Sequence, residues 1–480
     1  MRINIIDTLK NKNVRYGGYA ALITFAVLSG IVILNLLIQS IPAELDITKN
    51  KLYSLSDQTK KVVNKLSEDV NIYGLYKVGQ ENEEVAVVLK KYTTLSKHIK
   101  LDYIDPDKNP TFINKYDKDK KGIREGSLIV ESGKNFKVIS PYDLYDISYG
   151  QTGNPQLMGF TVEQRLTSAL LYVSSGYSPR IYELTGHQEY SFADFSLSDT
   201  LQKENYEIES INLITSPKVP DDAAILAVIS PKFDITAAEE DKIIDYLENG
   251  GRALFLFDLV SFDPMPVFSN LLKSYGVGIE TGVVMEGDTT RRLQADNPFF
   301  VTPALASHEI VNPLSSNDLN VIIPNAQGVA ILAVRKRNVE VEPLLTTSKN
   351  SWIRTVDNGS IRKIDSDISG PVNLAVAVSK KKMESNEKEG FRIVVAGSAR
   401  FLSPIPPFGT LKGNVEFLMN TLSWVNNRSE TISIRSKSLF TLPLQMNAVS
   451  VFIYAGVVVI LIPLIILVCG LVIWLKRRHL

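Results

Sequence analysis

Four side chains in this chain of 480 residues combine residue types and positions that suit ligand binding or catalysis: His187, Glu189, Ser230 and Asp258. Each lies at or just after the end of a predicted strand. A histidine with carboxylates nearby can bind a polar ligand or transfer protons. In the alternative interpretation, His187 and Glu189 only cap and orient the start of a helix. The capping interpretation is the favoured one, the crevice is the best candidate for a binding site, and both interpretations stay open at this point.

Several common catalytic and metal-binding patterns are missing from the sequence. There is no G-x-x-x-x-G-K-[ST] motif, so the chain has no P-loop for ATP. There is also no G-x-S-x-G or G-x-C-x-G motif to expose a nucleophile. The only cysteine, Cys469, lies in an apolar stretch, and a total of four histidines disfavours a zinc cluster. We expect no catalytic residue, no metal and no cofactor.

The four candidate residues belong to a block that alternates strands and helices. Its segment AAILAVIS, residues 223–230, is a continuous apolar run, which is typical of a strand covered on both faces. The alternation predicts a doubly wound parallel sheet, and ligands bind to such sheets at the carboxyl ends of the strands. We therefore expect the four residues to meet in a crevice there. The predicted elements are the strands Arg180–Thr185, Ile208–Asn212, Ala223–Ser230, Ala253–Asp258 and Phe391–Ala396, and the helices Phe192–Asn205, Thr236–Asn249, Val267–Tyr275 and Val415–Val425.

A smaller block with the order β-α-β-α-β-β precedes this sheet. That order is typical of a thioredoxin-like module. No C-x-x-C motif occurs, which excludes a dithiol redox role, so we interpret the block as a small binding or packing module. A helix that Ser54 or Ser56 can cap precedes it, near residue 57. The predicted elements of the block are Val70–Val78, Glu83–Leu95, Ile99–Ile104, Phe112–Tyr116, Ser127–Glu131 and Asn135–Ile139.

Two long apolar stretches, Tyr19–Ile41 and Val449–Leu475, flank the central part of the chain. Each exceeds the roughly 20 apolar residues that cross about 30 Å of hydrocarbon. Basic residues precede the first stretch and follow the second, which predicts two spans with both termini cytoplasmic and the central part extracytoplasmic. A cleaved signal peptide is the alternative for the first stretch, but signal peptides have apolar cores of only about 7–15 residues. The basic residues are Arg2, Lys10, Lys12, Arg15, Lys476, Arg477 and Arg478.

Charge and length limit the remaining possibilities. Lys+Arg and Asp+Glu both number 52, so the net charge is zero and no basic field for nucleic acid is expected. The part between the spans has about 400 residues, which is too long for a single core. We predict a cytoplasmic N-terminus (1–18), a first span (19–41), a thioredoxin-like module (42–160), a doubly wound domain with an inserted strand-rich region (161–437), a linker (438–448), a second span (449–475) and a cytoplasmic tail (476–480).

Five segments of the chain, taken in order, resemble the GldG-like family, the auxiliary membrane subunits of ABC-2 type exporters that were first named for gliding motility. Residues 46–56, DITKNKLYSLS, resemble the juxtamembrane stretch after the family's first span. Residues 161–170, TVEQRLTSAL, resemble its link into the second domain. No single segment is specific to the family, but the occurrence of all five in this order is. The other segments are YELTGHQE (182–189), YLENGG (246–251) and GNVEF (413–417).

The resemblance implies a second domain related to class I glutamine amidotransferase-like folds without their catalytic machinery. It also implies that separate ABC ATPase and permease subunits act with this chain, because no permease half is fused to it. The chain departs from the common family pattern at Gln188, Leu259 and Ser398, where Gly, Pro and Asp are usual. These departures weaken the case for an inherited small-molecule site.

The leading hypothesis is a non-catalytic auxiliary subunit of an ABC-2 type export system. Such a subunit lies in membrane lipid, binds a separate ATPase and permease, and engages substrate or an unidentified extracytoplasmic partner through its ectodomain. The first alternative is a membrane-anchored surface enzyme or ligand-binding protein that uses the crevice around His187, Glu189 and Asp258. The second is a structural or adhesive membrane protein.

Overall fold

The computed structural model describes residues 12–40, 46, 48, 51–118, 120, 122–149, 155–259, 265–355, 361–380, 390–406, 408–427, 437–438 and 456–478. Contacts between residues divide the chain into two compact units, Met1–Ser54 and Leu55–Leu480. Residues 1–11, 41–45, 439–455 and 479–480 lie outside the described part. They include parts of both predicted spans, most of the predicted linker and the basic residues Arg2 and Lys10.

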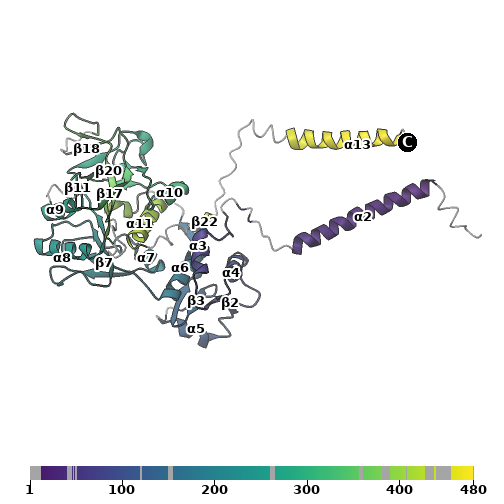
Figure 1. Cartoon of the computed structure of the whole chain (residues 1–480), viewed down its shortest axis with the longest axis horizontal. Coiled ribbons are helices and arrows are strands. Elements are labelled where there is room, and N and C mark those ends of the chain that lie inside the picture. Colours follow the sequence, from purple (N-terminus) through teal and green to yellow (C-terminus); the bar gives the residue numbers. More distant parts are fainter. Residues whose placement is uncertain are drawn as a thin grey trace, which may run out of the picture. The chain divides into compact units, whose positions relative to one another are not determined.

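Apolar helices occur at both ends of the described part (Figure 1). Helix α2 (Lys12–Ser40) contains the apolar stretch Ala21–Leu36. Towards the C-terminus, one turn of π-helix, η4 (Gly456–Leu461), continues into α13 (Ile462–Arg478). Among the described residues one helix, Gly456–Leu475, is long and apolar enough to cross a membrane, and none of it is buried. The span at 19–41 and the two-span topology remain predictions.

A small α/β module begins after Leu55. Its elements are α3 (Asp57–Asn64), β1 (Val70–Leu75), α4 (Glu83–Leu95), β2 (Ile99–Ile104), α5 (Pro110–Tyr116), β3 (Leu128–Ser132) and β4 (Asn135–Ile139). The sheet order is β2-β1-β3-β4, with β1 and β2 parallel and the other neighbours antiparallel. Ser56 caps α3, because its hydroxyl accepts a hydrogen bond from the Thr59 amide at 3.2 Å. The order of elements is the predicted one, and the thioredoxin-like classification remains a prediction.

A second, smaller sheet and a long helix follow the module. They comprise η1 (Pro141–Leu144), β5 (Tyr145–Tyr149), β6 (Pro155–Phe160), α6 (Val162–Ser175) and β22 (Lys437–Ser438). We call the part of the chain from residue 55 to residue 438 the body. Strand β22 is the last element of the body in the chain, and it pairs antiparallel with β6. Helix α6 packs against α3, β3 and β4. None of these strands is predicted from the sequence.

An eight-stranded sheet forms the centre of the larger domain. Its strands are β7 (Arg180–Leu184), β8 (Glu207–Ile211), β9 (Ala223–Ile229), β10 (Arg252–Leu256), β14 (Ala304–Leu305), β17 (Val339–Thr346), β20 (Asn373–Lys380) and β21 (Arg392–Ala396). The order is β14-β17-β20-β21-β10-β9-β7-β8. The last five are mutually parallel, and the other three extend the sheet in antiparallel fashion. The predicted parallel sheet is therefore present within a mixed α/β domain.

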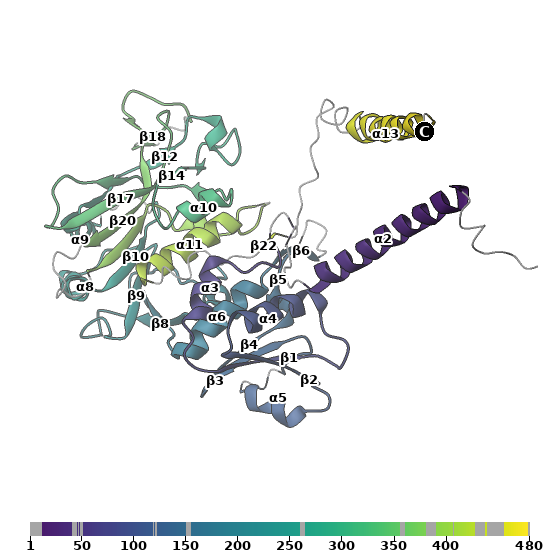
Figure 2. The ribbon, with the colours of Figure 1, turned by 45° about the vertical axis from the view of Figure 1, so that its right-hand side comes forward.

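Helices cover both faces of this sheet, as Figures 1 and 2 show. Helices α8 (Ala237–Glu248) and α9 (Pro266–Ser274) pack on one face, while α7 (Ser198–Lys203), α10 (Asn312–Ser316) and α11 (Lys412–Val425) pack on the other. Strand β9 divides its side chains between the two cores. Ile225 and Ala227 belong to one core, and Leu226 and Val228 belong to the other. This two-sided burial explains the apolar run in the sequence.

Helix α7 is shorter than predicted. The sequence predicts a helix over Phe192–Asn205, but α7 begins only at Ser198. The Asp194 carboxylate accepts hydrogen bonds from the amide and the hydroxyl of Ser191, at 2.7 and 2.8 Å, which folds this segment into a turn. Ser196 then has a left-handed backbone with φ of 58°. The helix begins six residues later and ends two residues earlier than predicted, so the prediction is wrong mainly about where the helix starts.

The region inserted between β10 and β21 is rich in short strands, as predicted. A buried ion pair between Arg354 and Asp367, with Nε and Oδ1 2.6 Å apart, joins two of its segments. The remaining short elements are β11 (Val277–Ile279), β12 (Val283–Met285), η2 (Thr289–Arg291), β13 (Phe300–Val301), β15 (Ile323–Pro324), β16 (Val329–Ile331), β18 (Trp352–Arg354), β19 (Ile368–Ser369) and, after β21, η3 (Arg400–Leu402).

Candidate functional site

The four candidate residues all lie at the carboxyl edge of the parallel strands, where the sequence places them. His187 and Glu189 follow β7, Ser230 follows β9, and Asp258 lies two residues beyond β10. Strands β7 and β9 are neighbours, although β8 separates them in the chain, so the strand order reverses between them. Such a reversal point is where ligands bind in doubly wound sheets. The side chains form two separate clusters at this edge.

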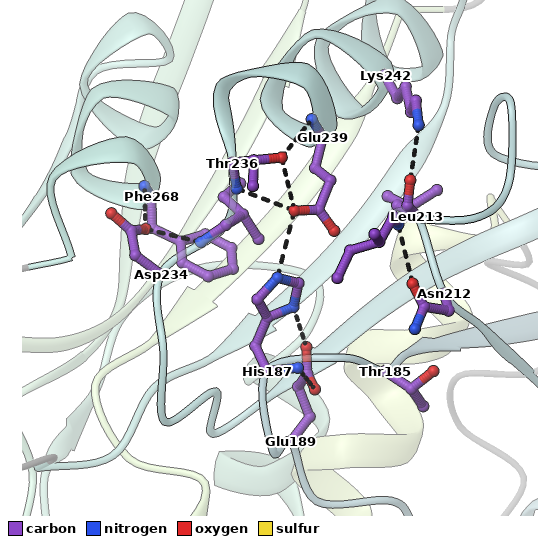
Figure 3. A network of polar contacts seen from close by, with 12 residues as sticks. Thr185, His187, Glu189, Asn212, Leu213, Asp234, Thr236, Glu239, Lys242 and Phe268 are labelled. Carbon is purple, nitrogen blue, oxygen red and sulfur yellow. Dashed lines mark hydrogen bonds and ion pairs between the residues drawn. The ribbon is translucent and has the colours of Figure 1, made fainter.

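The first cluster, which we call the histidine cluster, consists of His187, Glu189, Thr236 and Glu239 (Figure 3). The His187 Nδ1 atom lies 3.0 Å from Glu189 Oε1, and its Nε2 atom lies 3.3 Å from Glu239 Oε2. The side chains of Glu189 and Glu239 are 2% and 1% exposed. An imidazole thus lies buried between two carboxylates.

Backbone conformation and hydrogen bonds hold His187 in this position. Gly186 has φ of 126° and Gln188 has φ of 57°, so a left-handed residue lies on each side of the histidine. The His187 carbonyl oxygen accepts a hydrogen bond from the Lys232 amide at 2.8 Å, which ties this turn to the loop after β9. Gln188 stands where the resembling family has glycine, although this conformation favours glycine.

Glu239 connects the cluster to the start of α8. Its Oε2 atom accepts hydrogen bonds from the Thr236 amide and hydroxyl at 2.9 and 2.8 Å, and Thr236 Oγ1 in turn accepts from the Glu239 amide. This reciprocal arrangement is a capping box. Glu239 Oε1 is buried and has no hydrogen-bond partner among the described residues. The histidine cluster therefore closes the N-terminus of a helix and leaves one carboxylate oxygen unused.

The protonation of His187 decides how well this cluster is satisfied. A neutral imidazole carries one N–H donor, whereas a protonated one carries two. Both ring nitrogens face carboxylate oxygens, so only the protonated ring can donate to both.

The two carboxylates contact different nitrogens, and among the described residues no group of three or more His, Cys, Asp or Glu side chains is arranged to hold a metal ion.

The second cluster, which we call the serine cluster, consists of Ser230, Lys232 and Asp258. The Ser230 hydroxyl donates a hydrogen bond to Asp258 Oδ2 at 2.8 Å and accepts one from Lys232 Nζ at 2.6 Å. Asp258 Oδ1 accepts from the Ala399 amide at 2.9 Å, at the carboxyl end of β21. Burial lowers the pKa of Lys232, and the nearby Asp258 carboxylate opposes this shift. The cluster joins the loops after three strands.

Ser230 does not present its hydroxyl as an exposed nucleophile would. Its backbone has φ of 51°, a left-handed conformation at the end of a strand, which is the backbone setting of a sharp strand-to-helix turn. However, the residue is fully buried, and its hydroxyl is hydrogen-bonded to both Lys232 and Asp258. This geometry suits the packing of three loops better than attack on a substrate.

Three residues of these clusters, Thr236, Glu239 and Lys232, are not among the predicted site residues. The Thr-x-x-Glu pattern at 236–239 is a recognisable capping-box signal. The position of Glu239 at the start of a helix could therefore have been predicted from the sequence. Nothing in the sequence around Lys232 distinguishes it from a surface lysine. Its role follows only from the fold, which brings the loops after β9 and β10 together.

Three cavities in the described part of the chain lie apart from the four candidate residues. One, of about 590 Å³, is lined by parts of β5, α6, α7 and α11. Another, of about 540 Å³, lies against β4 and the loop before β3. A third, of about 700 Å³, lies near His308 and Trp424 at the amino edge of the sheet. None of these three includes His187, Glu189, Ser230 or Asp258 among its lining residues.

Comparison with protein families classifies the larger domain. Residues 178–420, a little over half of the chain, match the family described as "ABC-type uncharacterized transport system", a family of ABC transport auxiliary proteins. The chain belongs to this family. Residues 49–145 match a second family, described as a domain of unknown function, DUF7088. No curated protein matches the chain in sequence.

Some solved structures share parts of the chain's shape at low sequence identity. The mmIFT52 N-terminal domain is 16% identical, with a TM-score of 0.37 over 51% of this chain and 97% of its own. A ThuA-like protein from Parabacteroides merdae is 10% identical, with a TM-score of 0.28 over 56% of this chain and 95% of its own. A domain of the alkylhydroperoxide reductase AhpF from Enterococcus faecalis has a TM-score of 0.18 at 15% identity, over 32% of this chain and 75% of its own.

Replacing His187 by alanine removes the imidazole that separates two buried carboxylates. Because the substitution leaves two buried carboxylates without their imidazole hydrogen-bond partner, we expect the free energy of unfolding to fall by about 1–3 kcal/mol. Chemical unfolding of the full chain in detergent measures this change. The matched control is His98→Ala: His98 is exposed and contacts exposed Asp69 at 3.1 Å, so little change is expected. Equal effects of the two substitutions would contradict the buried cluster.

Glu183 on β7 makes the stability depend on pH. Burial raises the pKa of this carboxyl above its ordinary value of 4.5. The folded state therefore keeps the proton over a range above pH 4.5, and stability falls as pH rises through that range. Gln can still accept the 2.6 Å hydrogen bond from the Phe192 amide. We expect Glu183→Gln to unfold at a higher temperature than the native chain at pH 8, and at the same temperature at pH 4.

The exposed carboxyl of Glu68 provides the control for this titration. Glu68→Gln should leave the melting temperature unchanged at both pH values. A native chain that is more stable at pH 8 than the Glu183→Gln variant would show that Glu183 gains more from ionisation than it loses by burial.

Proposed function

We propose that this protein is a non-catalytic auxiliary subunit of an ABC-2 type export system of the GldG-like kind. Helix α2 and the helix Gly456–Leu475 are its two membrane spans. Both termini face the cytoplasm, and the module and the larger domain lie outside the membrane on the opposite side. A separate ATPase and a separate permease supply the energy and the conducting path.

The observation that carries this proposal is the combination of the family match with an exposed apolar helix. Residues 178–420 belong to an ABC transport auxiliary family. The helix Gly456–Leu475 follows this domain in the chain and buries none of its surface in the body. A transport-family domain with an unburied apolar helix indicates association with a membrane. The second span and the orientation rest on the apolar stretch and the basic flanks in the sequence.

The non-catalytic part of the proposal rests on the geometry of the two clusters. Ser230, the residue best placed to be a nucleophile, is fully buried and hydrogen-bonded on both sides. His187 has a carboxylate at each ring nitrogen, so neither nitrogen is directed at a bound molecule. The ectodomain then acts through contacts, and we infer that it engages exported substrate or another extracytoplasmic protein.

Purification from membranes in mild detergent tests the association. We expect the full chain to co-purify with an ABC ATPase and a polytopic permease. Gly470→Leu is a sharp variant, because a Cβ atom at Gly470 meets nothing within 4 Å inside this chain. The variant should therefore insert normally and lose at least about tenfold of the recovered permease if this helix face packs against it. Val472→Leu is the matched control and should retain the permease. Recovery of the chain alone, as a single species, would contradict the proposal.

A ligand-binding or enzymatic use of the crevice is the second candidate. Two observations favour it: the reversal of strand order between β7 and β9, and the unpartnered, buried Oε1 atom of Glu239. In this proposal His187, Glu189, Ser230 and Asp258 bind the ligand. Hydrolysis of p-nitrophenyl acetate by the full chain tests the enzymatic form of this candidate. The auxiliary-subunit proposal expects the rate of buffer alone, whereas a rate that Ser230→Ala abolishes would favour the enzyme.

A further inference from the structure

Two sequence segments that resemble family motifs, 46–56 and 161–170, meet in the structure at one buried carboxylate. That carboxylate belongs to Glu163, in the first turn of α6. Its side chain is only 4% exposed. The Ser56 amide, at the end of the first segment, donates a hydrogen bond to Glu163 Oε1 at 2.6 Å, across 107 positions of sequence. The end of the first segment and the start of the second are thus joined at one residue.

The contact between α3 and α6 extends beyond this hydrogen bond. The Thr59 hydroxyl donates to the same Glu163 oxygen at 2.7 Å, and it lies 3.0 Å from the Thr167 hydroxyl one turn further along α6. Tyr92 of α4 adds a hydrogen bond to the Glu163 carbonyl oxygen at 3.1 Å and another contact to Thr167 at 2.7 Å. All of these groups are buried or nearly so. The start of α3 is therefore held to α6 by a network of directed bonds.

The other carboxylate oxygen of Glu163 binds the segment that leads to the C-terminal helix. Lys437 Nζ lies 2.6 Å from Glu163 Oε2, and the lysine side chain is 15% exposed. Lys437 belongs to β22, whose two residues pair with Phe160 and Gly159 of β6. Strand β6 ends immediately before α6 begins. One glutamate thus holds the chain where it enters the body after α2 and where it leaves the body before α13.

The electrostatics of Glu163 explain why this junction is stable. Burial raises the pKa of its carboxyl, but the Lys437 ammonium and the hydrogen bonds from Ser56 and Thr59 outweigh burial and lower the pKa overall. The carboxylate therefore stays charged in the folded state. A buried charge of this kind depends on all of its partners, because removing one of them leaves it uncompensated.

Helix α6 also contacts the larger domain, so the junction at Glu163 is connected to that domain. Arg165 Nη1 and Gln164 Nε2 contact Glu204 Oε1, just after α7, at 2.7 and 2.9 Å. Asn205 Nδ2 donates to the Ser168 carbonyl oxygen at 2.8 Å. The first two turns of α6 are thus bonded directly to the loop between α7 and β8.

The segment before Ser56 has an ordered turn of its own. Asp46 accepts hydrogen bonds from the amides of Thr48 and Tyr53, at 3.0 and 2.9 Å, and from the Ser54 hydroxyl at 2.9 Å. These hydrogen bonds outweigh desolvation and lower the pKa of Asp46 to about 2. Asp46, Thr48, Tyr53 and Ser54 are thus joined by hydrogen bonds within the first unit.

We propose that Glu163 is a mechanical clamp that couples the two membrane-proximal ends of the body to each other and to α6. This inference rests on the proposed membrane function, since the clamp joins the segments that lead to the two helices. A movement of the segment at Ser56 or of the segment at Lys437 then reaches the other segment and α6 through one residue. The clamp is a positioning device, and it requires no ligand.

Hydrogen–deuterium exchange on the purified full chain tests the clamp. Lys437→Met removes one partner of Glu163. We expect backbone amides of residues 55–64 to exchange about tenfold faster in this variant. These residues are far from Lys437 in the sequence, but the uncompensated carboxylate of Glu163 weakens the hydrogen bonds to Ser56 and Thr59. Lys437→Arg keeps the charge and should retain the native exchange rates, which separates coupling from a general failure to fold.

Lys412→Met is the matched control. Lys412 forms an ion pair with Asp146 at 3.5 Å, linking α11 to β5, and its loss should leave residues 55–64 unchanged. The clamp is overturned if Lys437→Met changes exchange only around β22, or if Lys412→Met loosens residues 55–64 equally. Because no permease is present in this experiment, its outcome is independent of the co-purification test.

Discussion

A carboxylate buried in protein is unfavourable unless hydrogen-bond donors or a cation surround it, and this protein buries carboxylates where its segments join. Glu163 joins α3, α6 and β22. Glu239 joins the turn after β7 to the start of α8, and Asp258 joins the loops after β9 and β21. In each case the donors come from different parts of the chain. The donors reach these carboxylates only when the correct segments have come together, so these residues help to specify the assembly of the body.

This use of charge bears on how the carboxyl edge of the sheet is interpreted. In doubly wound folds this edge is the usual place for a ligand. Here the polar side chains at the edge mainly bond to one another, and the bonds tie loops to helix starts. These bonds hold the loops at the edge together, which suits the proposed role of an auxiliary subunit that acts through contacts.

Much of the larger domain could be predicted because its signals are local. The apolar run at 223–230 indicates a strand covered on both faces, and the cores on either side of β9 bear this out. The helix after Thr236 was predictable from its cap, and Gly250 ends it. The helix expected from Phe192 failed for a local reason too: Asp194 folds the preceding residues into a turn, a competing hydrogen bond that helix periodicity does not reveal.

The candidate site was placed on the correct edge, but its division into two clusters was not foreseen. Periodicity, caps and apolar runs depend on neighbours a few positions apart. The sequence alone therefore determines the order of strands and helices, the long apolar stretches and the capping box. The pairing of His187 with Glu239, of Ser230 with Lys232 and Asp258, and of Ser56 and Lys437 with Glu163 depends on how the elements pack. No local rule relates residues 107 positions apart, and only the folded chain brings such donors to one carboxylate.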